Sequence, residues 1–180
     1  YQPMPSEGGH ADFAPNNDDE IELLRHLRSH YLHVSYERVV SGHGLHAIYD
    51  YVRDSRKNEP TWLAEQIKTG DPAAVIAAAG LKGQAQVATQ ALDLFASIYG
   101  AEAGNLALKA MALNGVYLGG GVAPKLLAKL KDGTFMKAFT NKGRYARLMT
   151  SITVKVVMNQ KTALLGAATI AATLAHSPTP

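Results

Sequence analysis

The sequence contains no cysteine among its 180 residues, and this absence removes several kinds of chemistry. Disulfide bonds, thiol catalysis and every cysteine-ligated zinc site are excluded. Neither sign of charge dominates, because the sequence has 18 Lys and Arg and 15 Asp and Glu, which gives a net charge of +3. This excess is too small and too evenly spread to predict a nucleic-acid partner. A chain without cysteine suits a cytoplasmic protein.

Long apolar runs are absent as well. The longest one, residues 163 to 175, is shorter than the ~20 residues that a membrane-spanning helix needs, so it predicts a buried helix and no membrane partner. The N-terminus is polar and shows no signal peptide. The chain begins at Tyr1 rather than Met, with its richest polar segment directly after, so we expect a fragment of a longer protein. The length and the 47% hydrophobic content fit one domain with a packed core.

Helical signals dominate the first two thirds of the sequence. Asn17 followed by Glu20 predicts a helix start with a capping box, and the apolar spacing assigns the buried face to Ile21, Leu24, Leu27 and Tyr31. Residues 34–42 are expected to form a short helical turn that ends at Gly42. A second helix is expected to follow, with Leu45, Ile48, Tyr49 and Val52 on its apolar face.

The later part of the chain combines helix and strand signals. Residues 85–113 predict a long helix, in which Gly100 and Gly104 indicate a kink or a close approach of another helix, since each costs ~1 kcal/mol relative to alanine. Short strands are predicted at 116–118 and within 151–159, and a last helix at 161–175. The order strand, turn, helix predicts an α/β fold that is helix-rich with a small sheet.

The segment "EGGHADF" carries the densest chemistry in the chain. Paired glycines let a backbone approach a ligand, and the side chains of Glu7, His10 and Asp12 can share hydrogen bonds with several hydroxyls, as a sugar requires. An exposed turn without a ligand fits the same spacing equally well. A metal ion held by His10 and Asp12 is less natural, because alternating residues of an extended segment point to opposite faces.

A second candidate is "YLGGGVAPK", where Gly119, Gly120 and Gly121 form a turn before a helix. Such a turn favours an anion or a flat ligand against the backbone, although it also occurs as an ordinary strand-to-helix connection. It contains no established nucleotide-binding fingerprint. Lys125 is expected to be a solvated surface lysine, and the spacing around Glu37 predicts an ordinary helix-surface acid.

Five segments follow one another in this order: "EGGHADFAP", "VSYERVVSGHGL", "GNLALKAMALNGVYLGGGVAPKLL", "FTNKGRYARLM" and "ALLGAA". Together they resemble the bacterial glucokinase family, the zinc-free hexose kinases of the actin-like ATPase superfamily. The resemblance covers nearly the whole chain. A neighbouring group of sugar kinases and repressors carries a similar glycine–histidine motif but binds zinc with cysteines, which this chain lacks. The resemblance implies an actin-like ATPase (ribonuclease H-like) large domain over residues 1–159, followed at 160–180 by a helix and tail that would pack on a small domain.

The resemblance also implies roles for individual residues. Glu7, His10 and Glu37 would hydrogen-bond the hydroxyls of glucose, and Gly119, Gly120 and Gly121 would lie near the adenosine of ATP. The reaction implied is phosphoryl transfer from MgATP to the 6-hydroxyl of glucose, in an enzyme that is usually a homodimer.

Other expected parts of the family are absent from these 180 residues. The Asp that acts as general base and both phosphate-binding loops do not occur, so no catalytic residue is assigned in this chain. The chain alone is therefore expected to be inactive and, without its small domain, to expose an apolar face on the last helix. A non-catalytic sugar sensor on the same fold is an alternative. A plain helical interaction domain is a third, and it requires Glu7, His10 and Glu37 to lie far apart.

Overall fold

A computed structural model describes residues 4–175 of the chain. The ten helices within these residues are α1 (Asp18–Arg28), α2 (Gly42–Arg56), α3 (Thr61–Thr69), α4 (Pro72–Leu81), α5 (Gln86–Ala110), α6 (Val122–Lys125), α7 (Leu127–Leu130), α8 (Thr134–Thr140), α9 (Ala146–Ser151) and α10 (Thr162–Ala175). The single 3₁₀ turns are η1 (Gly8–His10), η2 (Tyr36–Arg38) and η3 (Gly143–Tyr145), and the strands are β1 (Val116–Leu118) and β2 (Val154–Val156). The helix-rich α/β composition expected from the sequence is thus confirmed.

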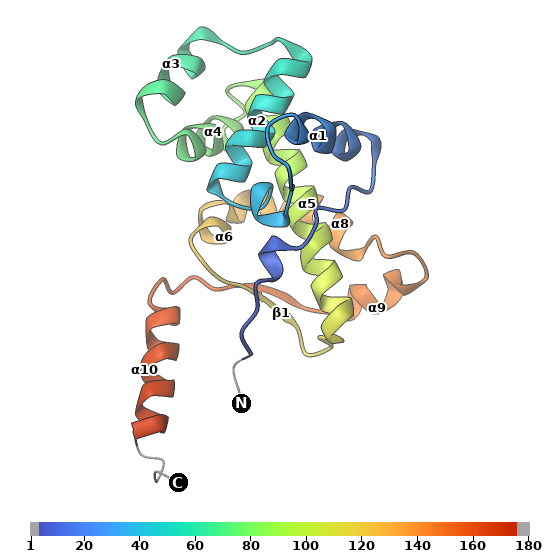
Figure 1. Cartoon of the computed structure of the whole chain (residues 1–180), viewed down its shortest axis with the longest axis vertical. Coiled ribbons are helices and arrows are strands. Elements are labelled where there is room, and N and C mark those ends of the chain that lie inside the picture. The colour runs from blue at the N-terminus through green and yellow to red at the C-terminus, as the bar shows by residue number, and fades with distance from the viewer. Residues whose placement is uncertain (1–3, 176–180) are drawn as a thin grey trace.

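The long helix α5 runs through the middle of the molecule (Figure 1). Its contacts with other elements are most extensive to α8, α2 and α4. The apolar spacing of this helix predicts a buried stripe of Leu92, Phe95 and Tyr99. Leu92 and Phe95 are fully buried, whereas Tyr99 is half-buried and Ile98 is buried in its place. This helix therefore carries the centre of the hydrophobic core, around which the shorter helices pack.

The two expected glycines explain how closely α8 approaches α5. A Cβ atom on Gly100 would lie 2.1 Å from the Phe135 carbonyl oxygen, and one on Gly104 would lie 2.6 Å from that of Phe139. No side chain other than hydrogen fits at either position without moving the α8 backbone. Close packing, the second of the two explanations offered by the sequence, is the correct one.

The sheet has two parallel strands among the described residues, with Val116 paired to Val154 and Leu118 paired to Val156. The first strand has the expected bounds. The second is shorter than the expected segment because α9 continues to Ser151. The expected alternation holds nevertheless, since Val154 and Val156 are half-buried while Lys155 between them is exposed.

The start of α1 confirms the expected cap. The Asn17 side-chain oxygen accepts a hydrogen bond from the Glu20 backbone amide at 2.9 Å. The Glu20 carboxylate accepts from the Asn17 side chain and from the Asn16 amide, one residue earlier than in an ideal capping box. The expected buried face is partly wrong, because Leu23 is fully buried while Ile21 is 38% exposed.

The expected helical turn over 34–42 is also partly wrong. The turn is limited to η2, and Gly42 begins α2 instead of ending the turn. The reason is the Ser41 hydroxyl, which accepts a hydrogen bond from the Gly44 amide at 3.0 Å and so caps α2. The four apolar residues expected on this helix, Leu45, Ile48, Tyr49 and Val52, are all buried.

Helix α10 departs most from what its composition predicts. The apolar run was expected to be buried, yet none of the residues of α10 is buried, and the helix extends away from the other elements (Figure 1). Its exposed residues include Leu164, Leu165, Ile170 and Leu174. The exposed apolar face expected from the resemblance is therefore present. No helix within residues 4–175 has the length and hydropathy to cross a membrane. The tail after Ala175 lies outside the described residues.

Candidate functional site

Backbone pairing brings together the two N-terminal motifs that contain His10 and Glu37, which lie 27 residues apart in the sequence. The Phe13 amide donates to the Val34 carbonyl and the Tyr36 amide donates to the Ala11 carbonyl, each at 3.0 Å. Asp12 and Ser35 form the antiparallel bridge between these bonds. The pairing places η1 directly against η2, so the sugar-binding candidates of both motifs face a common region.

The imidazole of His10 meets the carboxylate of Glu37 in this region. His10 Nε2 lies 3.2 Å from Glu37 Oε2, and the two side chains remain 63% and 59% exposed. Glu7 belongs to the same turn, since its carbonyl accepts a hydrogen bond from the His10 amide at 2.9 Å. A Cβ on Gly9 would come within 3.9 Å of the Glu37 Cβ, which shows how close the two loops lie. This convergence contradicts the reading as a plain helical interaction domain.

Asp12 does not join His10. Its carboxylate instead contacts His33 Nε2 at 2.7 Å, so Asp12 is paired with a different imidazole from the one considered in the sequence. Within residues 4–175, no group of three or more His, Asp or Glu side chains is placed to hold a metal ion. His33 was missed by the sequence analysis because it lies 21 residues from Asp12 and outside any motif.

A cavity of about 600 Å³ opens beside the His10–Glu37 pair. Its wall is rich in ring nitrogens and hydroxyl groups, contributed by His10, His30, His33, His43, Ser35 and Ser41. Arg38 also lines the cavity, and its guanidinium group lies over the Tyr31 ring at 4.4 Å from the ring centre. Such a wall offers many donors and acceptors to a neutral, hydroxyl-rich ligand.

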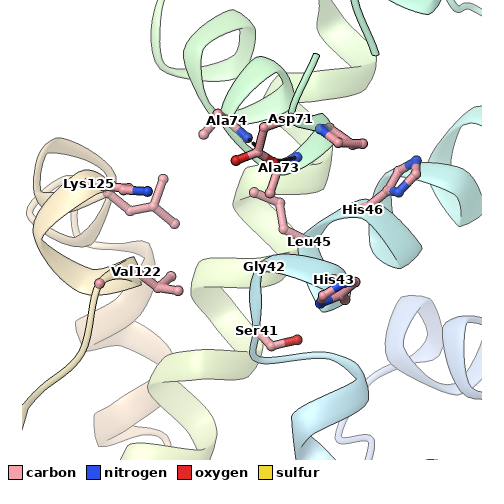
Figure 2. A pocket seen from close by; sticks show the side chains of 14 residues that line it. Ser41, Gly42, His43, Leu45, His46, Asp71, Ala73, Ala74, Val122 and Lys125 are labelled. Atoms are coloured by element: carbon pink, nitrogen blue, oxygen red, sulfur yellow. Dashed lines mark hydrogen bonds between the residues drawn. The ribbon is translucent and has the colours of Figure 1, made fainter. Parts of the chain in front are cut away.

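The glycine turn lies beside a second cavity of about 380 Å³ (Figure 2). Gly120 adopts φ = +87°, a conformation that favours glycine, whereas Gly121 is the member of the turn that lines the cavity. Helix α6 after the turn has only four residues, so its N-terminus gives little support to the anion that the sequence suggested. Lys125 is exposed, as expected, but it also lines this cavity.

The lining of the second cavity suits a flat ring system. Val122 and Lys125 stand on one side, while Leu45 and Ala73 stand on the other, as Figure 2 shows. Asp71 lies at the same edge, where its carboxylate caps α4 by accepting from the amides of Ala73 and Ala74. Apolar side chains on two sides with a few polar groups at the rim are typical of a small-molecule site.

The start of α2 forms a wall common to both cavities. Ser41 and His43 line each of them, from the side of the His10–Glu37 pair and from the side of the glycine turn. Neither residue is among the candidates that the sequence indicates, although the run "SGHGL" contains the capping serine that signals a helix start. The two candidate ligand sites are therefore neighbours.

A family model of glucokinases matches residues 1–174 of the chain. The chain belongs to the glucokinase family. Curated glucokinases agree with this assignment: that of Nostoc sp. is 44% identical over 97% of this chain, and that of Neisseria gonorrhoeae is 37% identical over 92%. The alignments cover 55% and 48% of those two relatives, so the chain spans about half the length of the glucokinases that it matches.

A solved glucokinase structure gives the same result. The crystal structure of a glucokinase from an Antarctic psychrotroph superimposes with a TM-score of 0.75 at 28% identity, over 93% of this chain and 49% of that one. The family resemblance read from the sequence motifs and the fold class of the actin-like ATPases are therefore confirmed. The chain corresponds to part of the glucokinases that it matches.

Proposed function

We propose that this glucokinase chain supplies the sugar-binding residues and the adenosine-side wall of an enzyme that transfers a phosphoryl group from MgATP to the 6-hydroxyl of glucose. The observation that carries the proposal is the convergence of His10 and Glu37, 3.2 Å apart, from two separate loops. Glu7, in the same turn as His10, would complete the set of groups that hydrogen-bond the sugar hydroxyls.

The two cavities fit the two substrates. The one beside His10 and Glu37 is lined by donors and acceptors, as a hexose requires, and the one beside Gly121 has the apolar sides that suit a purine. Gly119 and Gly120 would shape the turn against the adenosine without lining the cavity. The groups that hold Mg²⁺ and the triphosphate, and the carboxylate base on the 6-hydroxyl, would come from a region outside these 180 residues.

Catalysis in such an enzyme depends mostly on positioning and charge neutralisation, because phosphoryl transfer requires little covalent chemistry from the protein. The residues of this chain would fix the hexose so that its hydroxyl faces the donor, and they would select it by its hydroxyl pattern. Helix α10, which buries no residue here, would pack on the small domain that carries the base. We further propose a cytoplasmic homodimer.

The assay is glucose-dependent formation of ADP by the full-length product of the gene. Glu7→Gln and Glu37→Gln should each raise the KM for glucose about 10- to 100-fold, since hydrogen bonds to charged groups contribute ~1.5–3 kcal/mol. The KM for ATP should change less than about twofold. Glu65→Gln, an exposed acid on α3, is the matched control and should leave both values unchanged.

Three results would contradict parts of the proposal. Equal increases in both KM values would remove Glu7 and Glu37 from the sugar site. Glucose binding without any ADP formation by the full-length product would favour the sugar sensor over the kinase. The 180-residue chain by itself should form no ADP, and ADP formation by a homogeneous sample of it would show that the base and the phosphate-binding groups lie within this chain.

A further inference from the structure

A partly buried polar network adjoins η2 and joins three distant parts of the chain. The Lys142 ammonium donates to the Asn105 side-chain oxygen at 2.8 Å and to the Ala101 carbonyl at 2.9 Å. The Asn105 side-chain nitrogen donates to Glu102 at 3.1 Å and to the Tyr36 hydroxyl at 3.2 Å. Asn105 thus links the loop after α8 to η2, which lies 69 residues earlier in the sequence.

The charges around Asn105 fix the orientation of its amide. Its oxygen faces the cation of Lys142 and its nitrogen faces the carboxylate of Glu102, so a flipped amide would lose both contacts. Glu102 is only 8% exposed. Burial lowers the pKa of Lys142, against the opposing effect of Glu102 and Glu20. Polar groups held in such surroundings are costly to leave unpaired, so the arrangement is rigid.

Tyr36 connects this network to both sugar-binding loops. Its ring, 6% exposed, packs edge-on against Phe13 at 5.8 Å between centres. Its amide donates to Ala11, next to His10, and its carbonyl accepts from the amides of Val39 and Val40. Burial, together with the nearby Glu102, raises the pKa of the Tyr36 hydroxyl, which keeps it a neutral hydrogen-bonding group.

Glu37 directly follows Tyr36 in the single turn η2. Because the Tyr36 side chain is held in the core and the next side chain of the turn is exposed, the position of Tyr36 sets the position of Glu37. The His10 imidazole then meets Glu37 from the other loop. Glu37 is thus held by the buried Tyr36 beside it and by His10 from the other loop, and its exposed side chain has little freedom to move.

We propose that Asn105 and Lys142 are positioning residues for the sugar site: through their hydrogen bonds they fix Tyr36, which places Glu37 and its contact with His10. The inference rests on the proposed function for its kinetic consequence. Its structural consequence, a change at His10 when the network is broken, does not depend on any activity.

The kinetic test uses Tyr36→Phe and Asn105→Leu in the full-length gene product. Tyr36→Phe keeps the ring against Phe13 and removes only the hydroxyl, so folding is preserved. Each variant loses the hydrogen bond between Asn105 and the Tyr36 hydroxyl, so each should raise the KM for glucose about three- to tenfold, while the KM for ATP stays within about twofold. Tyr99→Phe, the same change on a half-buried tyrosine of α5 whose ring contacts Phe95 and Phe135, should leave both values unchanged.

The structural test uses the 180-residue chain and NMR of its imidazole groups, with the His10 signals identified by their loss in His10→Gln. Tyr36→Phe and Lys142→Met should shift the His10 signals, whereas Tyr99→Phe and Lys137→Met, an exposed lysine of α8, should not. Unmoved His10 signals in folded Tyr36→Phe and Lys142→Met would overturn the inference. If the full-length product phosphorylates no hexose, the proposed function fails. The inference about Asn105 and Lys142 is then judged by the His10 signals alone.

Discussion

Gly100→Ala should destabilise the chain, because it forces a methyl group into the closest contact between α5 and α8. The added Cβ would lie 2.1 Å from the Phe135 carbonyl oxygen and within 3.0 Å of its neighbouring backbone atoms, where ordinary contacts begin at 3.4 Å. The obstacle is backbone rather than the end of a flexible side chain. Relief therefore requires α8 to move away from α5 by about 1 Å, which loosens the core on both sides.

The magnitude follows from two opposing terms. Overpacking of a core costs ~1–3 kcal/mol, and a contact with immovable backbone belongs at the upper end. Replacing a mid-helix glycine by alanine stabilises the helix by ~1 kcal/mol. The net loss should be about 2 kcal/mol, which lowers the Tm of a chain of this size by roughly 4–8 °C.

Thermal unfolding followed by circular dichroism measures this loss. Gly166→Ala is the matched control, since Gly166 lies in α10 and a Cβ there would meet nothing within 4 Å. It should leave the Tm of the core within about 1 °C or raise it slightly. A Gly100→Ala variant that melts together with the wild type would show that α5 and α8 do not approach as closely as described, and would refute the reasoning.

Three further outcomes are expected for the stability of the chain. Asp71→Ala removes the cap of α4 and should cost ~1 kcal/mol in urea unfolding. At Asp132, burial raises the pKa, but hydrogen bonds from Lys129 and from the Thr134 amide outweigh it and hold the pKa below 3.8. The contribution of Asp132 to stability is therefore complete near neutral pH and is lost as the pH falls through that lowered pKa. Lys129→Met should accordingly reduce the loss of unfolding free energy at acid pH, measured by urea unfolding, by less than ~1 kcal/mol. Leu165→Ser, at a site 56% exposed, should change the unfolding free energy by less than ~0.5 kcal/mol.

Local signals in the sequence predicted local structure well. The cap at Asn17, the strand at 116–118 and the long helix around Leu92 depend on neighbouring residues, which the sequence displays directly. The pair of glycines in α5 indicated a kink or close packing for the same reason, because a helix tolerates Gly100 and Gly104 only at a cost, and the structure shows close packing.

What the sequence could not predict depends on contacts between distant segments. The hydrogen bond between Tyr36 and Asn105 spans 69 residues, and no periodicity announces it. The face of α1 was assigned partly wrongly, with Ile21 in place of Leu23, because α2, packed against it, decides which side is covered. Composition placed the last helix in the core, yet burial requires a partner surface, and within the described residues α10 finds none.

The site candidates divide in the same way. Glu7, His10 and Glu37 were named through the family motifs, and the structure brings the His10 and Glu37 side chains together. The cavity wall at Ser41 and His43 was not named, because a helix start is visible in the sequence only as a cap and not as the border of two cavities.

The border formed by Ser41 and His43 has a thermodynamic consequence. Ligands in both cavities would contact the same Ser41 and His43, so a shift of that wall by one ligand would change the affinity for the other. The coupling free energy would then be the same whichever ligand arrives first.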